Sequence, residues 1–304
     1  MEKDMSGEYE VLGGIYIVYN NICERNYRHN IHFDEASHIY EINHCQKGRF
    51  ECELKDGTIT YMSPGDFSIN VLNNSPMESL FPIGFYSGIT IYIDVSKFDE
   101  EAIVLQQIFE INYEKILSHI CEGERLFIKR SSDEVHHIFC EIYNASPNNN
   151  IKTYLKIKIQ ELFHYLNKVR DFKTNSDRKY YMKSNINVIK NINKFINNNY
   201  FKHYTYKSLS DLFDIKMTTM KQCYKFVYNE TINETIRNRR LKEAANLLRD
   251  TNKSITEIAV AVGYSDYSSF SKAFKKEYGI FPTGYKSCLL GHNASKKTRL
   301  INDI

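Results

Sequence analysis

The sequence predicts an α+β protein of two domains, a β-rich N-terminal domain followed by an all-helical domain with two helix-turn-helix units. Three observations lead to this fold class. Alternating polar and apolar residues, interrupted by turn signals, run from residue 8 to about residue 95. Residues 183–290 instead show apolar residues three and four positions apart, which is the spacing of helices. The formal charge also changes sign between the two parts.

The net charge of +3 is distributed unevenly along the 304 residues. Residues 1–182 contain 19 Lys and Arg against 27 Asp and Glu, whereas residues 183–304 contain 21 against 10. The first part therefore carries a net charge of −8 and the second +11. A basic domain joined to an acidic one favours a polyanion such as DNA as the partner of the basic part. A solvated lysine-rich surface is the alternative interpretation.

The composition is that of a globular protein, with 42% hydrophobic and 25% charged residues. The seven cysteines include no Cys-x-x-Cys pair, which argues against a zinc ribbon or a disulfide framework and for reduced thiols. The first residues do not resemble a signal peptide, and no apolar run approaches the ~18 residues of a membrane span. We therefore expect a soluble, cytoplasmic protein with no membrane partner.

The N-terminal strands are closely spaced. Residues 50–54 and 58–62 alternate on either side of Asp56-Gly57 and predict a hairpin. Further strands are predicted over residues 67–72 and 89–95. Antiparallel strands with such tight turns suggest a small barrel or jelly roll.

Helical spacing follows between residues 97 and 170, most clearly in an amphipathic helix over residues 154–166. This helix would form either a homodimer surface or a layer packed on its own barrel. We place the N-terminal domain at residues 1–170, a polar linker at 171–182, the helical domain at 183–290 and a polar tail at 291–304.

The second helix-turn-helix unit has clear start and stop signals. Ser254 and Glu257 form a capping-box pattern, and Gly263 is suited to the left-handed turn that ends the helix. Ser265 or Asp266 can cap the next helix. An apolar stripe that includes Phe270 and Phe274 faces inward on that helix, which leaves hydroxyls and lysines on the outside. Such side chains reach phosphates and base edges in a major groove, although an ordinary helical hairpin could carry the same surface.

The design is repeated earlier in the domain. Leu209, Leu212 and Phe213 lie on a first short helix, and Met220 and Tyr224 on the inner side of a second. A long helix over residues 232–248 joins the two units. Two units on a rigid connection could address major-groove faces one helical turn, ~34 Å, apart. The repetition makes the groove interpretation stronger than either unit does alone.

The C-terminal residues carry a family signature. Its elements are Arg240-Leu241, Ala244, Leu247-Leu248, Ile258-Ala259, Val262-Gly263-Tyr264-Ser265-Asp266, Ser269-Phe270-Ser271-Lys272-Ala273-Phe274, Tyr278-Gly279, Pro282 and Tyr285-Lys286. Over about one hundred residues the pattern resembles the AraC/XylS family. The resemblance implies a transcription regulator with a seven-helix DNA-binding domain, often preceded by a ligand-responsive cupin-like β-barrel. Double-stranded promoter DNA and RNA polymerase are the implied partners.

The resemblance also implies DNA-contacting residues on the two recognition helices. With the lysines that follow on each helix, they are Thr218, Thr219, Lys221, Gln222 and Lys225 in the first unit and Tyr267, Ser268, Ser269, Ser271, Lys272 and Lys275 in the second. The first unit is most similar to the branch of the family that contains siderophore-responsive regulators. It also departs from the family pattern, with Lys216 in place of a capping Ser, Asp214 in place of a turn Gly and Asn229 in place of a terminal Gly. The lost cap costs about 1 kcal/mol, which predicts a less rigid first unit.

Aromatic residues of the N-terminal strands are candidates for a small-molecule pocket. They are Tyr40, Phe50, Tyr61, Phe67 and Tyr92, together with Tyr16 and Phe81. Core packing is the alternative interpretation for most of them. A cupin-type metal enzyme is the weaker alternative: His29, His32, His38 and His44 lie near Glu41, but the sequence has no His-x-His pair. It also lacks a Gly-x-Ser-x-Gly elbow and a phosphate-binding glycine loop. We expect no enzyme activity, metal or cofactor, and keep a non-specific basic DNA scaffold as a further alternative.

Overall fold

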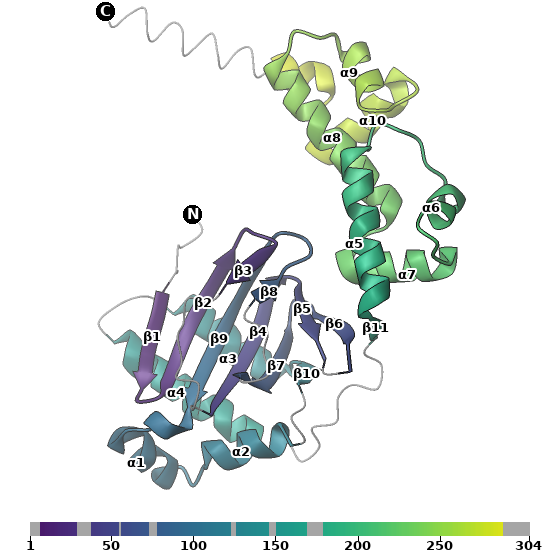
Figure 1. Cartoon of the computed structure of the whole chain (residues 1–304). Helices are drawn as coiled ribbons and strands as arrows, with labels where there is room; N and C mark the ends of the chain where they lie inside the picture. The colour runs from purple at the N-terminus through teal and green to yellow at the C-terminus, as the bar shows by residue number, and fades with distance from the viewer. Residues whose placement is uncertain are drawn as a thin grey trace, which may run out of the picture. The chain divides into compact units, whose positions relative to one another are not determined.

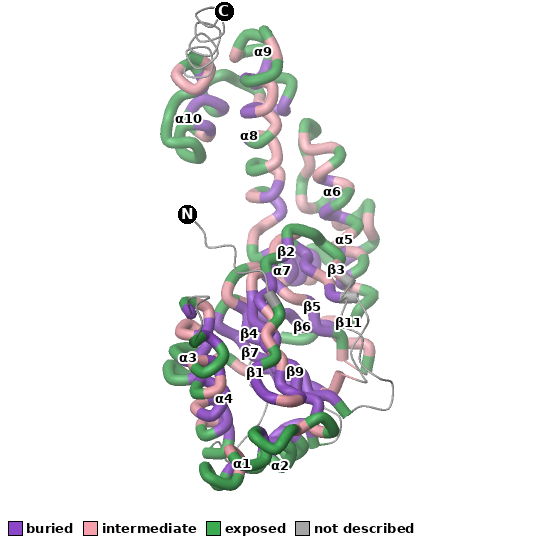
Figure 2. The backbone as a smooth tube through the Cα atoms, turned by 90° about the vertical axis from the view of Figure 1, so that its left-hand side faces the viewer, coloured by how far each residue is buried: buried purple, intermediate pink, exposed green. Residues whose placement is uncertain are grey.

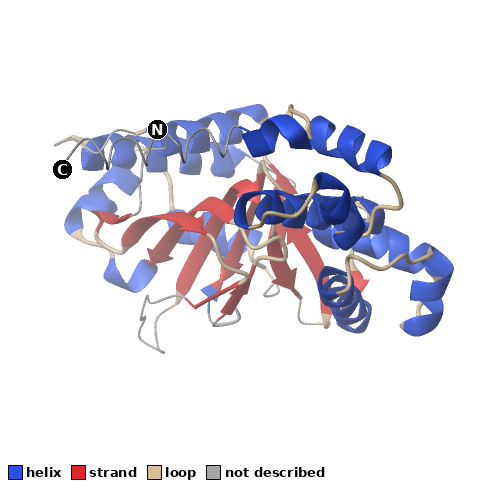
Figure 3. Cartoon of the chain, turned by 90° about the horizontal axis from the view of Figure 1, so that it is seen from above, coloured by secondary structure: helices blue, strands red, loops and turns tan. Residues whose placement is uncertain are grey.

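The computed structural model describes residues 7–28, 38–54, 56–72, 78–122, 126–145, 150–168 and 179–287. The chain divides into two compact units, Met1–Lys183 and Ser184–Ile304, which are considered separately (Figure 1). All described strands belong to the first unit, and the second is helical. Figure 3 distinguishes the strands in red from the helices in blue. This confirms an α+β protein with a β-rich N-terminal part and a helical C-terminal part. No described helix is long and apolar enough to cross a membrane.

The strands of the N-terminal unit form three antiparallel sheets. The largest has the order β1 (Gly7–Leu12), β2 (Ile15–Ile22), β9 (Tyr86–Asp94), β4 (Ile39–Gly48), β7 (Asp66–Val71) and β10 (Phe127–Arg130). The second consists of β11 (Tyr181–Met182), β6 (Thr58–Met62) and β5 (Phe50–Glu53), and the third of β3 (Asn26–Arg28) and β8 (Glu78–Leu80). Strands β5 and β6 confirm the hairpin predicted around Asp56-Gly57.

The described strands do not close into the barrel that the sequence predicted. The chain leaves the large sheet at Gly48, which has a left-handed φ of 90°. A Cβ there would lie 2.2 Å from the carbonyl oxygen of Phe85, so the bend requires glycine. After this bend β5 pairs with β6, and β6 also pairs with β11, instead of extending the ladder of β4.

The helices of the N-terminal unit supply the core on one face of the large sheet. They are α1 (Glu100–Ile108), α2 (Tyr113–Ile120), α3 (Asp133–Asn144) and α4 (Ile151–Lys168), preceded by the short 3-10 helix η2 (Val95–Lys97). Leu155, Ile159 and Phe163 of α4 are fully buried in a core that also contains Ile42 and Ile91 of the sheet. Figure 2 shows buried stretches on α4 and on the strands of the large sheet. The apolar stripe of the predicted helix 154–166 is therefore used inside its own unit, as the second of the two interpretations proposed.

The two faces of the large sheet differ in chemistry. Along β4, Tyr40 and Ile42 belong to the helix-covered core, whereas Glu41 and Asn43 lie on the opposite face because successive residues of a strand alternate. The register continues this pattern across the sheet, with Glu41 opposite Tyr92 and Asn70, and Asn43 opposite Thr90 and Ser68. These polar residues are at most 9% exposed. The large sheet thus has one apolar buried face and one polar buried face.

The end of the N-terminal unit is tied to the small sheet. The hydroxyl of Thr60 donates to the carbonyl of Lys179 at 3.0 Å, and Tyr181 pairs with Ile59. Residues 179–182 of the predicted linker therefore lie in the sheet, whereas residues 169–178 are outside the described residues. The predicted tail 291–304 is also outside them.

The helical unit contains both predicted helix-turn-helix pairs. Its helices are α5 (Lys183–Asn198, beginning at the last residue of the first unit), α6 (Tyr206–Leu212), α7 (Met217–Tyr228), α8 (Ile232–Asp250), α9 (Ile255–Ala261) and α10 (Tyr267–Tyr278), with residues 282–287 also helical. Helices α6 and α7 form the first pair, α9 and α10 the second, and α8 joins them (Figure 1). The predicted order of elements is confirmed.

Candidate nucleic-acid interface and ligand pocket

The second helix-turn-helix unit keeps its predicted caps. The backbone NH of Ser254 donates to Glu257 Oε2 at 2.7 Å, and the NH of Glu257 donates to Ser254 Oγ at 3.2 Å. Asp266 caps α10 by accepting the NH of Ser269 at 2.7 Å. Between the helices, Gly263 adopts φ 93°. These local bonds satisfy backbone donors at both helix starts and hold α10 in a defined direction.

Helix α10 buries one side and exposes the other. Phe270 and Phe274 are fully buried with Leu241, Ala259 and Val262 in one core cluster. The predicted contact residues on the exposed side are Tyr267, Ser268, Ser269, Lys272 and Lys275. This leaves hydroxyl and ammonium groups on one continuous surface, as a groove-reading helix requires.

Ser271 is a correction to the predicted contact set. It is 6% exposed and belongs to the buried side of α10. The reason is helical geometry, because Ser271 precedes the buried Phe274 by three residues and so shares its face. Its hydroxyl therefore cannot lie on the outer surface that the sequence assigned to it.

The first unit has weaker local capping, as predicted. Lys216 is the N-cap of α7 and makes no side-chain cap bond. Asp214 in the turn has φ 46°, and Asn229 at the end of α7 has φ 58°. Both residue types tolerate the left-handed region better than most, so the turns keep their shape without glycine.

A buried tyrosine, Tyr224, lies in the core around the first helix-turn-helix unit. The hydroxyl of Tyr224 donates to Asn193 Oδ1 at 2.8 Å and lies 2.9 Å from Thr235 Oγ1, which joins α5, α7 and α8. Leu212 lies on the first short helix, as predicted, and is 59% exposed. It is the last residue of α6, where the short helix ends beyond the buried Leu209.

The outer side of α7 carries the other predicted contact residues. Thr218, Lys221, Gln222 and Lys225 are exposed and Thr219 is half-buried. The Nζ of Lys221 lies 4.3 Å from the ring centre of Tyr206 in α6. In the second unit, Lys275 Nζ lies at the same distance from Phe281. The second helix of each helix-turn-helix pair thus places one lysine against an aromatic ring, which restricts the position of its ammonium group.

The linking helix is braced by Arg240, whose role differs from a DNA contact. Its Nε donates to the carbonyl of Tyr200 at 2.7 Å, and its Nη2 donates to the carbonyl of Lys202 at 2.9 Å. Its guanidinium also lies 5.8 Å from the ring centre of Tyr264, in the turn before α10. Arg240 therefore holds α8, the 200–202 turn and the second helix-turn-helix unit together.

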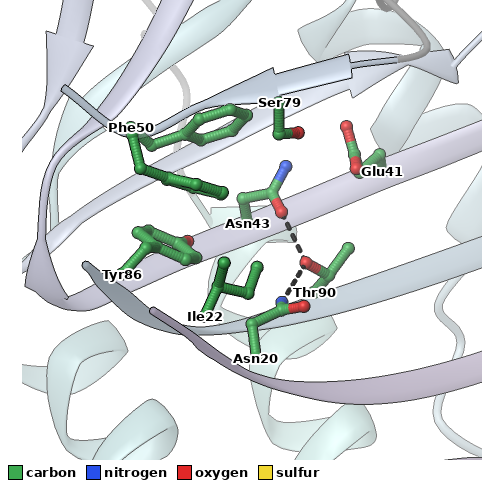
Figure 4. A pocket seen from close by; sticks show the side chains of 9 residues that line it. Asn20, Ile22, Glu41, Asn43, Phe50, Ser79, Tyr86 and Thr90 are labelled. Atoms are coloured by element: carbon green, nitrogen blue, oxygen red, sulfur yellow. Dashed lines mark hydrogen bonds between the residues drawn. The ribbon is translucent and has the colours of Figure 1, made fainter. Parts of the chain in front are cut away.

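A pocket opens on the polar face of the large sheet (Figure 4). Its lining residues are Asn20, Ile22, Glu41, Asn43, Phe50, Ser79, Phe81, Tyr86 and Thr90. Its cavity volume is about 10 Å³, which is on the scale of one water molecule. Polar groups line one side and aromatic rings the other, the combination typical of small-molecule sites.

The polar side of the pocket is a directed hydrogen-bond chain. Asn20 Nδ2 donates to Thr90 Oγ1 at 2.8 Å, and Thr90 Oγ1 donates to Asn43 Oδ1 at 2.7 Å (Figure 4). Beside it, Asn70 Nδ2 donates to Glu41 Oε2 at 3.0 Å. Burial raises the pKa of Glu41, while hydrogen bonds from Asn70, Asn43 and Tyr92 oppose this rise.

Comparison with known proteins assigns the helical unit. Residues 209–287 match the family model described as a helix-turn-helix domain. The chain is 37% identical over 73 residues to the HTH-type transcriptional activator RhaR of Mannheimia succiniciproducens, covering 24% of this chain and 26% of that relative. Residues 209–287 are therefore a helix-turn-helix domain similar to those of AraC/XylS regulators.

A second relative of this chain is the regulatory protein SoxS of Salmonella typhimurium. It is 36% identical over 67 residues, or 22% of this chain and 63% of the relative. Among solved structures, the C-terminal domain of AraT, a response regulator from Geobacillus stearothermophilus, has 25% identity and a TM-score of 0.33, covering 33% of this chain and 84% of that one. The matched residues thus span about a quarter and 63% of the two curated relatives.

Most of the aromatic residues predicted for a small-molecule pocket do not line this one. Phe50 lines it, as does Phe81, but Tyr40 and Phe67 belong to the core on the opposite, helix-covered face. These two residues follow the alternative interpretation, core packing, because alternation along a strand does not show which face of the sheet the helices cover.

Tyr61 and Tyr92 are also buried without lining the pocket. The Tyr61 hydroxyl donates to Glu51 Oε2 at 2.6 Å, which directs it into the small sheet. Tyr92 faces the polar side next to Glu41. Asn43 and Thr90 line the pocket but were not predicted from the sequence. Both alternate with isoleucines along their strands, and this alternation could have indicated a polar face.

The histidines give no metal site among the described residues, where no group of three or more His, Cys, Asp or Glu could hold a metal ion. His29 and His32 lie outside the described residues. His44 is buried against α3, with its ring stacked on Phe139 at 4.3 Å. Burial lowers the pKa of His44 to about 3, with smaller contributions from His136 and Arg130.

Proposed function

We propose that this protein is a sequence-specific transcription regulator, in which the helical unit reads double-stranded promoter DNA and the N-terminal unit senses a small molecule. One observation carries the proposal: two helix-turn-helix pairs of the same design each expose a face of hydroxyl, amide and ammonium groups. The basic charge of this part of the chain supplies the attraction for phosphate. Its relatives RhaR and SoxS are themselves named as regulators.

The contacts divide by chemistry. Lys272 and the other exposed lysines bind phosphates and set the affinity, whereas Ser269, Gln222 and Thr218 read base edges. The better-capped α10 is the more rigid reader. Helix α7, with no side-chain cap at Lys216, adapts more readily to the sequence that it meets.

The connection between the units provides a route for the signal. Phe50 in the pocket wall lies on β5, β5 pairs with β6, and β6 pairs with β11. Strand β11 ends at Met182, and α5 begins at the next residue, Lys183. A ligand that moves the β5–β6 hairpin therefore acts on the residue from which the first helix of the DNA-binding unit starts.

The outer partners follow from this function. A cytoplasmic regulator of this kind would act on transcription through RNA polymerase and could bind its promoter as a homodimer. Its effector would belong to siderophore metabolism if the first unit indicates the right branch of the family. A siderophore-uptake operon beside the gene would support that branch, and a sugar operon would argue against it.

The test compares specific and non-specific binding by the full chain. We expect it to protect a defined site in the DNA upstream of its own gene region and to bind random DNA much more weakly at moderate salt. Lys272→Ala should weaken binding and reduce the slope of log K against log salt by about 0.9. Ser269→Ala should relax discrimination at one base pair, by ~1–3 kcal/mol.

Ser271→Ala is the matched control for these variants. It removes the same hydroxyl one helical position from Lys272, but from the buried side of α10, and should leave the footprint unchanged. Equal affinity for promoter and random DNA would instead identify a non-specific basic scaffold. Unchanged footprints for both Lys272→Ala and Ser269→Ala would remove α10 as the reading helix.

A further inference from the structure

The pocket contains a buried carboxylate, Glu41, that lacks the cationic partner that two other buried carboxylates of its unit, Asp66 and Asp94, have. Asp66 faces Arg130 Nη1 at 3.7 Å, and Asp94 faces Lys97 Nζ at 3.5 Å. Glu41 is 8% exposed and has no ion pair among the described residues. Its neighbours are neutral: the side chains of Asn70, Asn43 and Tyr92.

The hydrogen-bond chain beside Glu41 is oriented to favour its negative form. Asn20 donates to Thr90 and Thr90 donates to Asn43, while Asn43 in turn donates to Glu41. Each polar group thus directs its donor hydrogen toward the carboxylate. In a chain of this orientation, each hydrogen bond polarises the next one, so the last bond, to the Glu41 carboxylate, becomes stronger.

The opposite wall is aromatic. Phe81 and Tyr86 are stacked with ring centres 4.8 Å apart, and Phe50 lies 5.6 Å from Phe81 and 5.7 Å from Tyr86. The hydroxyl of Tyr86 is buried and has no hydrogen-bond partner among the described residues. Aromatic faces attract cations, and an unpaired hydroxyl oxygen can accept a hydrogen bond from one.

We propose that this pocket binds the primary ammonium group of a small organic cation, with Glu41 as its charge partner and the Phe50, Phe81 and Tyr86 rings as the opposing wall. The proposal rests on the proposed sensor function and names the chemical class of its effector. A buried carboxylate without a cation is costly, and an ammonium ion supplies both the charge and three donors. The small cavity selects for size: it suits an –NH₃⁺ group and not a quaternary ammonium.

The test uses methylammonium chloride as the probe, tetramethylammonium chloride as the size control and methanol as the neutral control. Binding to the full chain is followed by ligand-observed NMR and by the shift in thermal midpoint at constant ionic strength. We expect saturable binding of methylammonium, weakened at least tenfold by Glu41→Gln, and no comparable response to either control compound. Glu10→Gln, which removes an exposed carboxylate from β1 of the same sheet, should bind as the unmodified chain does.

Two further measurements keep the proposal open to refutation. If Glu41→Gln fails to fold, Phe50→Leu replaces it, because Phe50 is half-buried and its ring faces the pocket (Figure 4); this variant should also weaken methylammonium binding several-fold. Equal responses to methanol and methylammonium, or unchanged binding in Glu41→Gln, would overturn the ammonium assignment. Promoter footprinting without any amine tests the regulator function separately. Failure of amine binding would therefore not contradict promoter binding, and failure of promoter binding would not contradict amine binding.

Discussion

Arg240 donates two hydrogen bonds from α8 to the backbone carbonyls of Tyr200 and Lys202, the shorter one joining its Nε to the Tyr200 oxygen at 2.7 Å. The bonded residues lie 38 and 40 positions apart in the chain. They join the turn after α5 to the helix that connects both helix-turn-helix units. The arginine that is part of the predicted family signature is thus a structural brace within the helical unit.

Replacing Arg240 with alanine should destabilise the helical unit by about 2 kcal/mol, since two charge-assisted hydrogen bonds are lost and two carbonyls lose their partners. Arg240→Lys keeps the positive charge but lacks the two separated donors of the guanidinium group. It should therefore recover only part of the lost stability. Urea unfolding of the full chain, followed by the transition of the helical unit, measures both. Lys242→Ala, an exposed residue on the same helix, should change the free energy of unfolding little. Equal losses in the two alanine variants would contradict the brace.

Gly263 and Gly279 form a matched pair for testing backbone conformation. Both have left-handed φ angles, 93° and 78°. A Cβ on Gly263 would lie 2.5 Å from the Phe201 carbonyl oxygen, whereas a Cβ on Gly279 meets nothing within 4 Å. Gly279→Ala should lower the free energy of unfolding by only the strain of an alanine in the left-handed region, ~1–2 kcal/mol. Gly263→Ala should cost more and should also reduce DNA binding by moving α10. Similar unfolding free energies for the two would rule out the steric argument.

The missing cap at α7 can be supplied. Lys216→Ser should place a hydroxyl where it can accept a backbone NH of the first turn and raise the free energy of unfolding by about 1 kcal/mol. The reverse change in the second unit, Asp266→Ala, removes an existing bond to Ser269 and should lower stability by about the same amount. Amide hydrogen exchange in the first turns of α7 and α10 reports each effect locally. Faster exchange in α7 after Lys216→Ser would be incompatible with this account.

Stability should fall as the pH drops below neutral because of His44. Its pKa is lowered to about 3 in the folded chain from an ordinary value of 6.5, so below pH 6.5 the unfolded chain takes up a proton that the folded chain does not. The sign is a loss of stability that grows from pH 6.5 down to about pH 3, amounting to roughly 2 kcal/mol between pH 7 and pH 5. His44→Phe retains an aromatic ring against Phe139 and should flatten this dependence in denaturant unfolding. The exposed His164→Ala is the control, and a slope unchanged by His44→Phe would exclude His44 as its source.

The coupling route through the small sheet predicts a variant that separates sensing from DNA binding. Lys183 Nζ lies 2.8 Å from both carboxylate oxygens of Glu53 on β5. Glu53→Gln should leave promoter affinity without effector unchanged but reduce the change that an effector produces. Lys183→Glu with Glu53→Lys should restore part of the response. Footprint titrations with and without methylammonium measure the difference, and an undiminished response in Glu53→Gln would exclude this ion pair from the route.

Sequence reasoning was most reliable where the determinants are local. The capping box at Ser254, the cap at Asp266 and the hairpin at Gly57 each involve residues within a few positions of one another. The same holds for the poorly capped start of α7 at Lys216. Local patterns therefore predicted the order of elements, both helix-turn-helix pairs and most of the exposed faces of α7 and α10.

What the sequence alone determined about this protein is its division into a β-rich acidic part and a helical basic part, and the duplicated units of the latter. The tertiary structure decided which face of each element is covered. Alternation shows that Tyr40 and Glu41 point in opposite directions, but only the packing of α4 against the sheet shows that the tyrosine side is core and the glutamate side holds the pocket. Tertiary structure also determined the burial of Ser271, the bracing role of Arg240 and the bend at Gly48. Each of these depends on neighbours distant in the chain, whose positions a local sequence pattern does not show.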